Sequence, residues 1–175
     1  MTRGGDGRTT GRLVIITGLP GSGRTTLAST LATSMPASRM CPDEWMTASR
    51  IDPWDSSARS RIEAFQLELA LDLLRRGKNV VIEWGAWARE ERDTLRQAAR
   101  SIGAAVELRY MTADLEELWR RIVARGLEGS GASRPIRRDE ARPIQRHELE
   151  EWFRIYEPPT DEELAEYDRY DGPPP

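Results

Sequence analysis

The 175-residue sequence has one cysteine, one histidine and one lysine, and these scarcities exclude several kinds of protein. Because Cys41 is the only cysteine, no intramolecular disulfide can form, which is typical of a protein from a reducing compartment. Cys41 and His147 together cannot supply the nitrogen and sulfur ligands of a zinc centre. The sequence therefore indicates neither a disulfide-stabilised secreted domain nor a zinc protein.

Long apolar runs and a basic excess are also missing. No stretch approaches the roughly 20 apolar residues of a membrane-spanning helix, and none has the charged start and apolar core of a signal peptide. We therefore expect a cytoplasmic protein without a membrane partner. The net charge of −3 argues against nucleic acid as a partner, because nucleic-acid-binding surfaces usually carry a basic excess.

What is present is the pattern of one soluble α/β domain. Hydrophobic residues make up 38% and charged residues 31% of the chain. Short apolar runs predict strands at 12–17, 37–40, 79–84 and 105–111, and helical periodicity predicts helices at 24–35, 57–76, 89–102, 114–125, 144–156 and 159–167. The apolar stripe of the second helix would comprise Ile62, Phe65, Leu69, Leu73 and Leu74. We expect one domain over 12–170, with unstructured ends at 1–11 and 171–175.

The alternation of strands and helices predicts a parallel sheet with helices on both faces. In such sheets, ligands bind beyond the C-terminal ends of the strands. The predicted strand ends lead to Gly18, Asp43, Glu83 and Met111. A Gly-, Ser- and Arg-rich segment at about 126–142 is long for a connection inside a domain, which is typical of a functional lid or of disorder.

The stretch "ITGLPGSGRTTLA", residues 16–28, has the spacing of a phosphate-binding loop between a strand and a helix. Gly18, Gly21 and Gly23 would let the backbone N–H groups wrap an anion at the helix N-terminus, with Ser22 and Thr26 completing the loop. Thr25 takes the place of the hydroxyl that binds Mg²⁺. The alternative is a tight turn that binds no ligand.

The loop departs from the pattern G-x-x-x-x-G-K-[ST] only at Arg24, where a lysine is expected. Arginine keeps the charge but is larger, planar and forked. All basic residues except Lys78 are arginines, which explains how an arginine could arise at this position but not whether it functions. Two interpretations stay open: an active site that uses arginine, and a site that binds nucleotide without transfer or has decayed.

Asp43, in "CPDEWM", follows the second predicted strand. A carboxylate at this place suits the general base that takes the proton from a phosphoryl acceptor. The alternative is a helix N-cap, a position where aspartate is preferred.

These motifs resemble the small P-loop kinases grouped with zeta toxin, chloramphenicol phosphotransferase and polynucleotide kinase, and more closely their actinobacterial "AAA family ATPase" relatives. The matching stretches cover most of residues 12–165; they are "GLPGSGRTTLA", "CPDEWM", "VVIEWGAWAREERDTLRQAARSIGAAVELRYM", "LEELWRRIVAR" and "EPPTDEEL". The resemblance implies a three-layer P-loop NTPase of the nucleotide-kinase type, with a central parallel sheet of about five strands and a helical lid at about 121–146.

The resemblance also implies roles for particular residues. Asp43 matches the general base, and Glu83 matches an acid near substrate and metal. Arg121 and Arg125 match lid arginines that hold the β- and γ-phosphates; four residues apart, they share one helical face. Polynucleotide kinases carry an arginine three residues after the base, whereas this chain has Met46, which argues further against a nucleic-acid acceptor.

The acceptor pocket is the least specified part of the site. Trp45, Trp54, Trp84 and Trp87 follow the second and third strands and could wall a base, a sugar or an aromatic antibiotic, or could simply be packing residues. Arginines near this region could meet an anionic substrate or be solvated; they are Arg50, Arg59, Arg89 and Arg92.

The sequence thus predicts a kinase dependent on ATP, or on GTP as an alternative, and on Mg²⁺. It would transfer the γ-phosphate to a hydroxyl of a small molecule such as an antibiotic, a nucleoside or a sugar. Arg24, Arg121 and Arg125 would act with Asp43 in catalysis, and Trp45, Glu83, Trp84 and Trp87 would line the substrate side. A non-catalytic nucleotide-binding protein and a toxin kinase acting on a nucleotide sugar are the alternatives. A regulatory GTPase is disfavoured, because no N-K-x-D-like motif follows the later strands.

Overall fold

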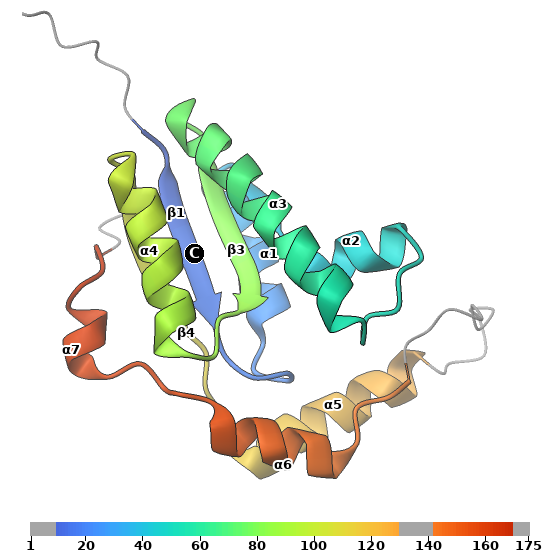
Figure 1. Cartoon of the computed structure of the whole chain (residues 1–175). Coiled ribbons are helices and arrows are strands. Elements are labelled where there is room, and N and C mark those ends of the chain that lie inside the picture. The colour runs from blue at the N-terminus through green and yellow to red at the C-terminus, as the bar shows by residue number, and fades with distance from the viewer. Residues whose placement is uncertain (1–9, 130–141, 170–175) are drawn as a thin grey trace, which may run out of the picture.

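A four-stranded parallel sheet forms the centre of the protein (Figure 1). The structure, a computed structural model, describes residues 10–129 and 142–169. The strands are β1 (Arg12–Thr17), β2 (Ala37–Met40), β3 (Asn79–Gly85) and β4 (Ala105–Tyr110), in the order β2-β3-β1-β4. This order places β1 and β3 in the middle of the sheet, so that the loop after β1 lies beside the end of β3.

Helices cover both faces of this sheet and its C-terminal edge. The helices are α1 (Arg24–Ser34), α2 (Pro42–Ala48), α3 (Ser56–Arg75), α4 (Arg89–Ser101), α5 (Leu115–Gly129), α6 (Arg146–Ile155) and α7 (Asp161–Leu164). In Figure 1, α3 and α4 lie over one face and α1 over the other, while α5 and α6 lie beyond the C-terminal strand ends. The three-layer α/β architecture predicted from the sequence is confirmed.

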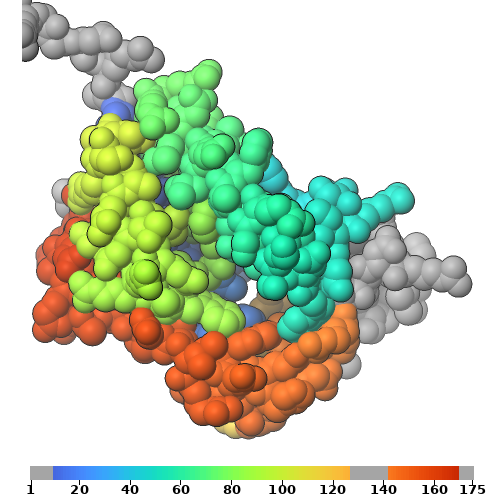
Figure 2. Space-filling view, viewed as in Figure 1, coloured from blue at the N-terminus to red at the C-terminus, as the bar shows by residue number. Residues whose placement is uncertain are grey.

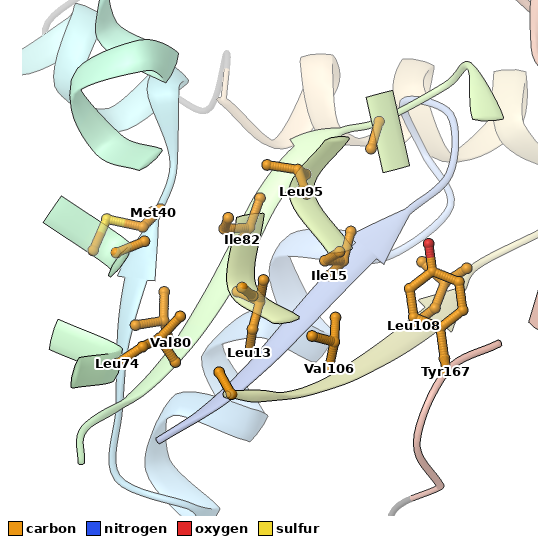
Figure 3. Close-up of a cluster of buried hydrophobic side chains, with 14 residues drawn as sticks. Leu13, Ile15, Met40, Leu74, Val80, Ile82, Leu95, Val106, Leu108 and Tyr167 are labelled. Atoms are coloured by element: carbon orange, nitrogen blue, oxygen red, sulfur yellow. The ribbon is translucent and has the colours of Figure 1, made fainter. Parts of the chain in front are cut away.

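The core explains why the strands read as continuous apolar runs. Residues on one face of the sheet pack under α3 and α4 in the cluster of Figure 3, which includes Leu13, Ile15, Val80, Ile82, Val106 and Leu108. Residues on the opposite face pack against α1 in a second cluster, which includes Val14, Ile16, Val81, Ala28 and Leu31. Because both faces are buried, the middle residues of β1 and β3 are apolar on both faces, and polar residues come only towards the strand ends.

The sheet has four strands rather than the five or so that the family resemblance implied. Four is the number of strands that the apolar runs themselves predicted. Beside β4, at the sheet edge, the backbone N–H of Asp168 donates to the carbonyl of Val106 (2.8 Å), and Val106 N–H donates back to the Asp168 carboxylate (2.7 Å). Within residues 10–129 and 142–169, this local pairing does not extend into a strand, because the residues shortly before Asp168 form α7.

The predicted apolar stripe of α3 is wrong at Phe65, which is 56% exposed. Gln66 is fully buried instead, because its side-chain oxygen accepts a hydrogen bond from the indole N–H of Trp84 (2.9 Å). At the N-terminus, the predicted unstructured segment extends too far. Thr10 donates to the carbonyl of Gly103 (2.7 Å), and Gly11 N–H donates to that of Leu74 (2.9 Å).

None of the helices in the described part of the chain is both long and apolar enough to cross a bilayer. Within residues 10–129 and 142–169, no group of three or more histidine, cysteine or acidic side chains is arranged to hold a metal ion. Residues 171–175, which we expect to form an unstructured tail, lie outside the described residues. Most of the Gly- and Arg-rich part of the predicted lid lies outside them as well.

Candidate functional site

The phosphate loop connects β1 to α1 at the C-terminal edge of the sheet, as its sequence predicts. Gly23 occupies the N-cap of α1, and Gly21 has a φ of 85°. A Cβ atom on Gly21 would lie 2.7 Å from the carbonyl oxygen of Leu118 in α5. Glycine is therefore required here both by the backbone conformation and by the close approach of the lid helix.

Two hydroxyl residues of the loop differ in environment. Ser22 is buried, and its Oγ has no hydrogen-bond partner within the described residues. Thr26 is exposed in the first turn of α1. Their roles in nucleotide binding stay predictions.

Glu83 is the buried acid of the site, with only 5% of the residue exposed at the C-terminal end of β3. Thr25 donates its hydroxyl hydrogen to Glu83 Oε1. Arg39, on β2, donates from Nη2 to Glu83 Oε2 (2.7 Å). The structure thus brings the predicted Thr25 and Glu83 into contact and adds Arg39, a site residue that sequence reasoning missed. Its signal was a charged residue near the end of a strand that otherwise reads as buried.

Arg24 extends from the start of α1 towards the end of β3. Its Nη1 atom lies 3.1 Å from the place where a Cβ of Gly85 would stand. Burial lowers the pKa of Arg24, and the carboxylates of Glu83 and Asp43 oppose this by electrostatic attraction. Because the pKa of an arginine starts so high, the guanidinium stays charged at neutral pH. A half-buried positive charge therefore lies between the phosphate loop and two acids.

Asp43 lies in the first turn of α2, with 62% of its side chain exposed, and forms an ion pair with Arg59 of α3. The N-cap of α2 is Cys41, so Asp43 is not the helix cap that the sequence left open as an alternative. An exposed carboxylate near Arg24 can meet a substrate hydroxyl that enters from solvent.

The lid arginines approach the loop unequally. Arg121 Nη1 lies 3.4 Å from the carbonyl oxygen of Gly21, and its Nε donates to Glu117 (2.6 Å). Arg120 also pairs with Glu117 (2.7 Å), and these hydrogen bonds from Arg120 and Arg121 lower the pKa of Glu117 to about 2. Arg125 is exposed one turn further along α5. Of the two predicted lid cations, the structure brings Arg121 to the phosphate loop.

The predicted substrate tryptophans are mostly engaged in contacts within the protein. Trp45 packs against Phe65, with ring centroids 5.8 Å apart, in a groove between α2 and α3. Trp84 donates to Gln66, and the indole N–H of Trp87 donates to the carbonyl of Gly18 (3.2 Å). These contacts agree with the alternative that the tryptophans are packing residues.

Trp54, Trp87 and Trp152, which we call the tryptophan cluster, join α6 to both sides of the site. Trp152 of α6 lies 5.6 Å from Trp87 and stacks on Trp54 at 6.1 Å, measured between ring centroids. The guanidinium of Arg142 lies over the other ring of this stack, 3.8 Å from the Trp54 centroid. Figure 2 shows a hollow between α6, in orange, and the α2–α3 region, in teal, with blue atoms of the β1 and phosphate-loop region at its edge. Helix α6 therefore borders an opening next to the phosphate-loop region.

The four arginines whose role the sequence left open have different environments in the structure. Arg59 contacts Asp43. Arg89 pairs with Glu166 (2.8 Å), and Arg50 is exposed. Arg92 is fully buried against Glu163, with distances of 2.6 and 2.9 Å. Only Arg59 lies where it can influence the acceptor side.

Known structures share this architecture at low sequence identity. A gluconokinase from Sinorhizobium meliloti 1021 is 18% identical with a TM-score of 0.58, over 89% of this chain and 79% of that one. APS kinase CysC from Mycobacterium tuberculosis, solved with AMPPNP and APS, is 17% identical with a TM-score of 0.53, over 83% and 97%. Kti12 from Chaetomium thermophilum, solved with ADP-AlF3, is 21% identical with a TM-score of 0.60, over 85% and 81%.

A search of curated proteins gave no significant match. The AAA domain family matches residues 13–159, a span that includes the phosphate loop, the acids and α5. The protein therefore belongs to the AAA domain family (AAA_33), and its fold is that of the P-loop kinases.

Proposed function

We propose that the protein is an ATP-dependent kinase that transfers the γ-phosphate to a hydroxyl group of a small molecule. One observation carries this proposal: beside the phosphate loop, Thr25 donates to the buried Glu83, and Arg24 lies where both Glu83 and Asp43 attract it. A tight turn without a ligand would have no need to bury a carboxylate beside an arginine, since burying a charge costs free energy.

The nucleotide phosphates would lie on the loop, where backbone N–H groups at the start of α1 point towards an anion. Arg24 would contact the β- and γ-phosphates, and Arg121 and Arg125 would approach from the lid side. Such fixed positive charges stabilise the charge that develops on the transferring group. Thr25 and Glu83 offer two hard oxygen ligands, directly or through water, that fit Mg²⁺, which when bound neutralises phosphate charge.

In the transfer step, the acceptor oxygen forms a bond to the γ-phosphorus while the bond from that phosphorus to the β–γ bridging oxygen breaks. The acceptor hydroxyl proton passes to the carboxylate of Asp43, and ADP leaves. Arg59 holds Asp43 from the α3 side, which restricts the orientation of the base.

The chemical class of the acceptor is inferred from the family resemblance. The resemblance to the zeta-toxin and chloramphenicol phosphotransferase group favours an antibiotic, a nucleoside or a nucleotide sugar. A polynucleotide is disfavoured, because Met46 is fully buried where polynucleotide kinases present an arginine.

The test is ADP release from ATP and Mg²⁺ in the presence of nucleosides, hydroxyl-bearing antibiotics and nucleotide sugars. Asp43→Asn should abolish acceptor-dependent ADP release while leaving affinity for AMPPNP intact. Asp72→Asn, on a partly exposed part of α3 remote from the site, should leave both unchanged.

Retained turnover in Asp43→Asn would show that Asp43 is not the general base. Tight AMPPNP binding without acceptor-dependent ADP release in this panel would favour the non-catalytic nucleotide-binding protein. Growth arrest on expression, relieved by Asp43→Asn, would favour the toxin kinase.

A further inference from the structure

Gly85, the last residue of β3, lies in a place where its neighbours leave little room for a side chain. It is buried and has a φ of 104°, a conformation that residues with a side chain rarely adopt. A Cβ atom here would lie 3.1 Å from Arg24 Nη1 and 2.9 Å from Trp87 Nε1. Glycine inside a strand weakens the strand and often marks the close approach of another group. Two groups approach Gly85: the indole of Trp87 and the guanidinium of Arg24.

The space at Gly85 matches the difference between the two P-loop cations. A lysine ends in one compact ammonium group, whereas an arginine ends in a planar fork with two terminal nitrogens. The fork of Arg24 is placed with one of these nitrogens against the bare Cα of Gly85. A side chain at position 85 would occupy space that the second nitrogen of the fork requires and that an ammonium group does not.

The other neighbours leave the guanidinium little freedom to retreat. Trp87 is held by a hydrogen bond from its Nε1 to the carbonyl of Gly18 and by its contact with Trp152. Glu83 is fixed by hydrogen bonds from Thr25 and Arg39. An added methyl group at position 85 would therefore press on both Trp87 and the guanidinium of Arg24.

We propose that Gly85 is a positioning residue that adapts the phosphate loop to arginine, so that residues 24 and 85 function as a coupled pair. This inference rests on the proposed nucleotide site but not on phosphoryl transfer. It answers the question raised by the missing lysine: the site is built around Arg24 and is not a lysine site that has decayed.

The test is a double-mutant cycle on AMPPNP affinity in Mg²⁺, with the wild-type protein, Gly85→Ala, Arg24→Lys and the double variant. Gly85→Ala should weaken binding about tenfold when residue 24 is arginine and about twofold or less when it is lysine. The ratio, about fivefold, corresponds to a coupling free energy of about 1 kcal/mol. The cost of φ strain at position 85 is the same in both backgrounds and cancels.

Gly103→Ala is the matched control, because Gly103 also has a positive φ of 78° but nothing within 4 Å of its Cβ position. It should destabilise the fold slightly and leave AMPPNP affinity unchanged in either background. Equal weakening by Gly85→Ala in both backgrounds would overturn the coupling and assign the effect to the backbone or to Trp87.

If Gly85→Ala fails to fold, the AMPPNP affinity of Arg24→Lys alone still tests the proposal. The proposal expects weaker AMPPNP binding, because the ammonium leaves the space beside Gly85 unfilled, and a gain in affinity would overturn it. Coupling between residues 24 and 85 in AMPPNP affinity, without phosphorylation of any acceptor, would support the coupled pair and contradict the proposed kinase function. No AMPPNP binding by the wild-type protein would overturn both.

Discussion

At the residue scale, Glu83 organises the site. Its carboxylate accepts hydrogen bonds from Thr25 and Arg39 and attracts the guanidinium of Arg24. A carboxylate with so little exposure is destabilising unless opposite charge and donors surround it. The two arginines and the hydroxyl supply this compensation, so each of them holds the others in place.

Thr25 gives the first prediction. Thr25→Ala should weaken Mg²⁺-dependent AMPPNP binding about tenfold, or by about 1.4 kcal/mol, because the hydroxyl that would bind the metal is lost. Thr25→Ser should bind nearly as well as the wild-type protein. Calorimetric titration with and without EDTA measures the effect, and an equal loss in EDTA would show that the hydroxyl does not act through the metal.

The sequence was informative about these residues because motif spacing specifies them. Arg24, Thr25 and Glu83 were each predicted from a position next to a strand end, and they meet as expected. Arg39 could not be predicted, because its importance arises only when β2 pairs with β3 and the two strand ends become neighbours. Phe65 and Gln66 were assigned incorrectly because the position of Trp84, which decides their burial, is not visible in helical periodicity.

At the element scale, the segment from α6 to α7 fastens the loop after β3. Arg92 of α4 donates to the carbonyls of Ala86 and Trp87, and forms a buried ion pair with Glu163 of α7. Glu157 N–H donates to the carbonyl of Trp87 (3.1 Å). Because Trp87 contacts the phosphate loop, these bonds help to position the loop itself.

The buried ion pair gives the second prediction. Arg92→Met should lower the free energy of unfolding by about 3–5 kcal/mol, because it leaves the charge of Glu163 buried without a partner. The double variant Arg92→Met/Glu163→Met should be less destabilised than Arg92→Met. Urea unfolding measures the free energy of unfolding of each variant. A double variant whose loss of free energy equals the sum of the losses in Arg92→Met and Glu163→Met would contradict the account.

At the scale of the whole molecule, the fold was predictable to the level of its layers. The apolar runs predicted the four strands, and the parallel order followed from their alternation with helices. The fifth strand came from the family resemblance alone, and the described residues do not form it. At that edge of the sheet, they form α7 and a local pairing at Asp168. Which of the tryptophans pack together depends on how α6 docks, and no local pattern encodes this.

Alkaline pH gives the third prediction. Burial raises the pKa of Tyr156 and of Tyr167 to about 12, from an ordinary value of 10. The folded state therefore favours the neutral phenols, so their contribution to stability is complete below pH 10 and is lost as the pH rises through 12. Tyrosinate absorbance of the folded protein should show Tyr156 and Tyr167 ionising late, and the step should diminish in Tyr156→Phe and Tyr167→Phe. Ionisation of these two tyrosines near pH 10 while the fold is intact would contradict this burial.

The most direct test of the account is the AMPPNP affinity of Arg24→Ala in Mg²⁺. If Arg24 is a working phosphate-binding cation, the folded variant should bind at least about tenfold more weakly. Arg75→Ala, exposed at the end of α3 remote from the site, should bind as the wild-type protein does. An Arg24→Ala protein that binds AMPPNP as tightly as the wild-type protein would contradict the claim that this loop uses arginine in place of lysine.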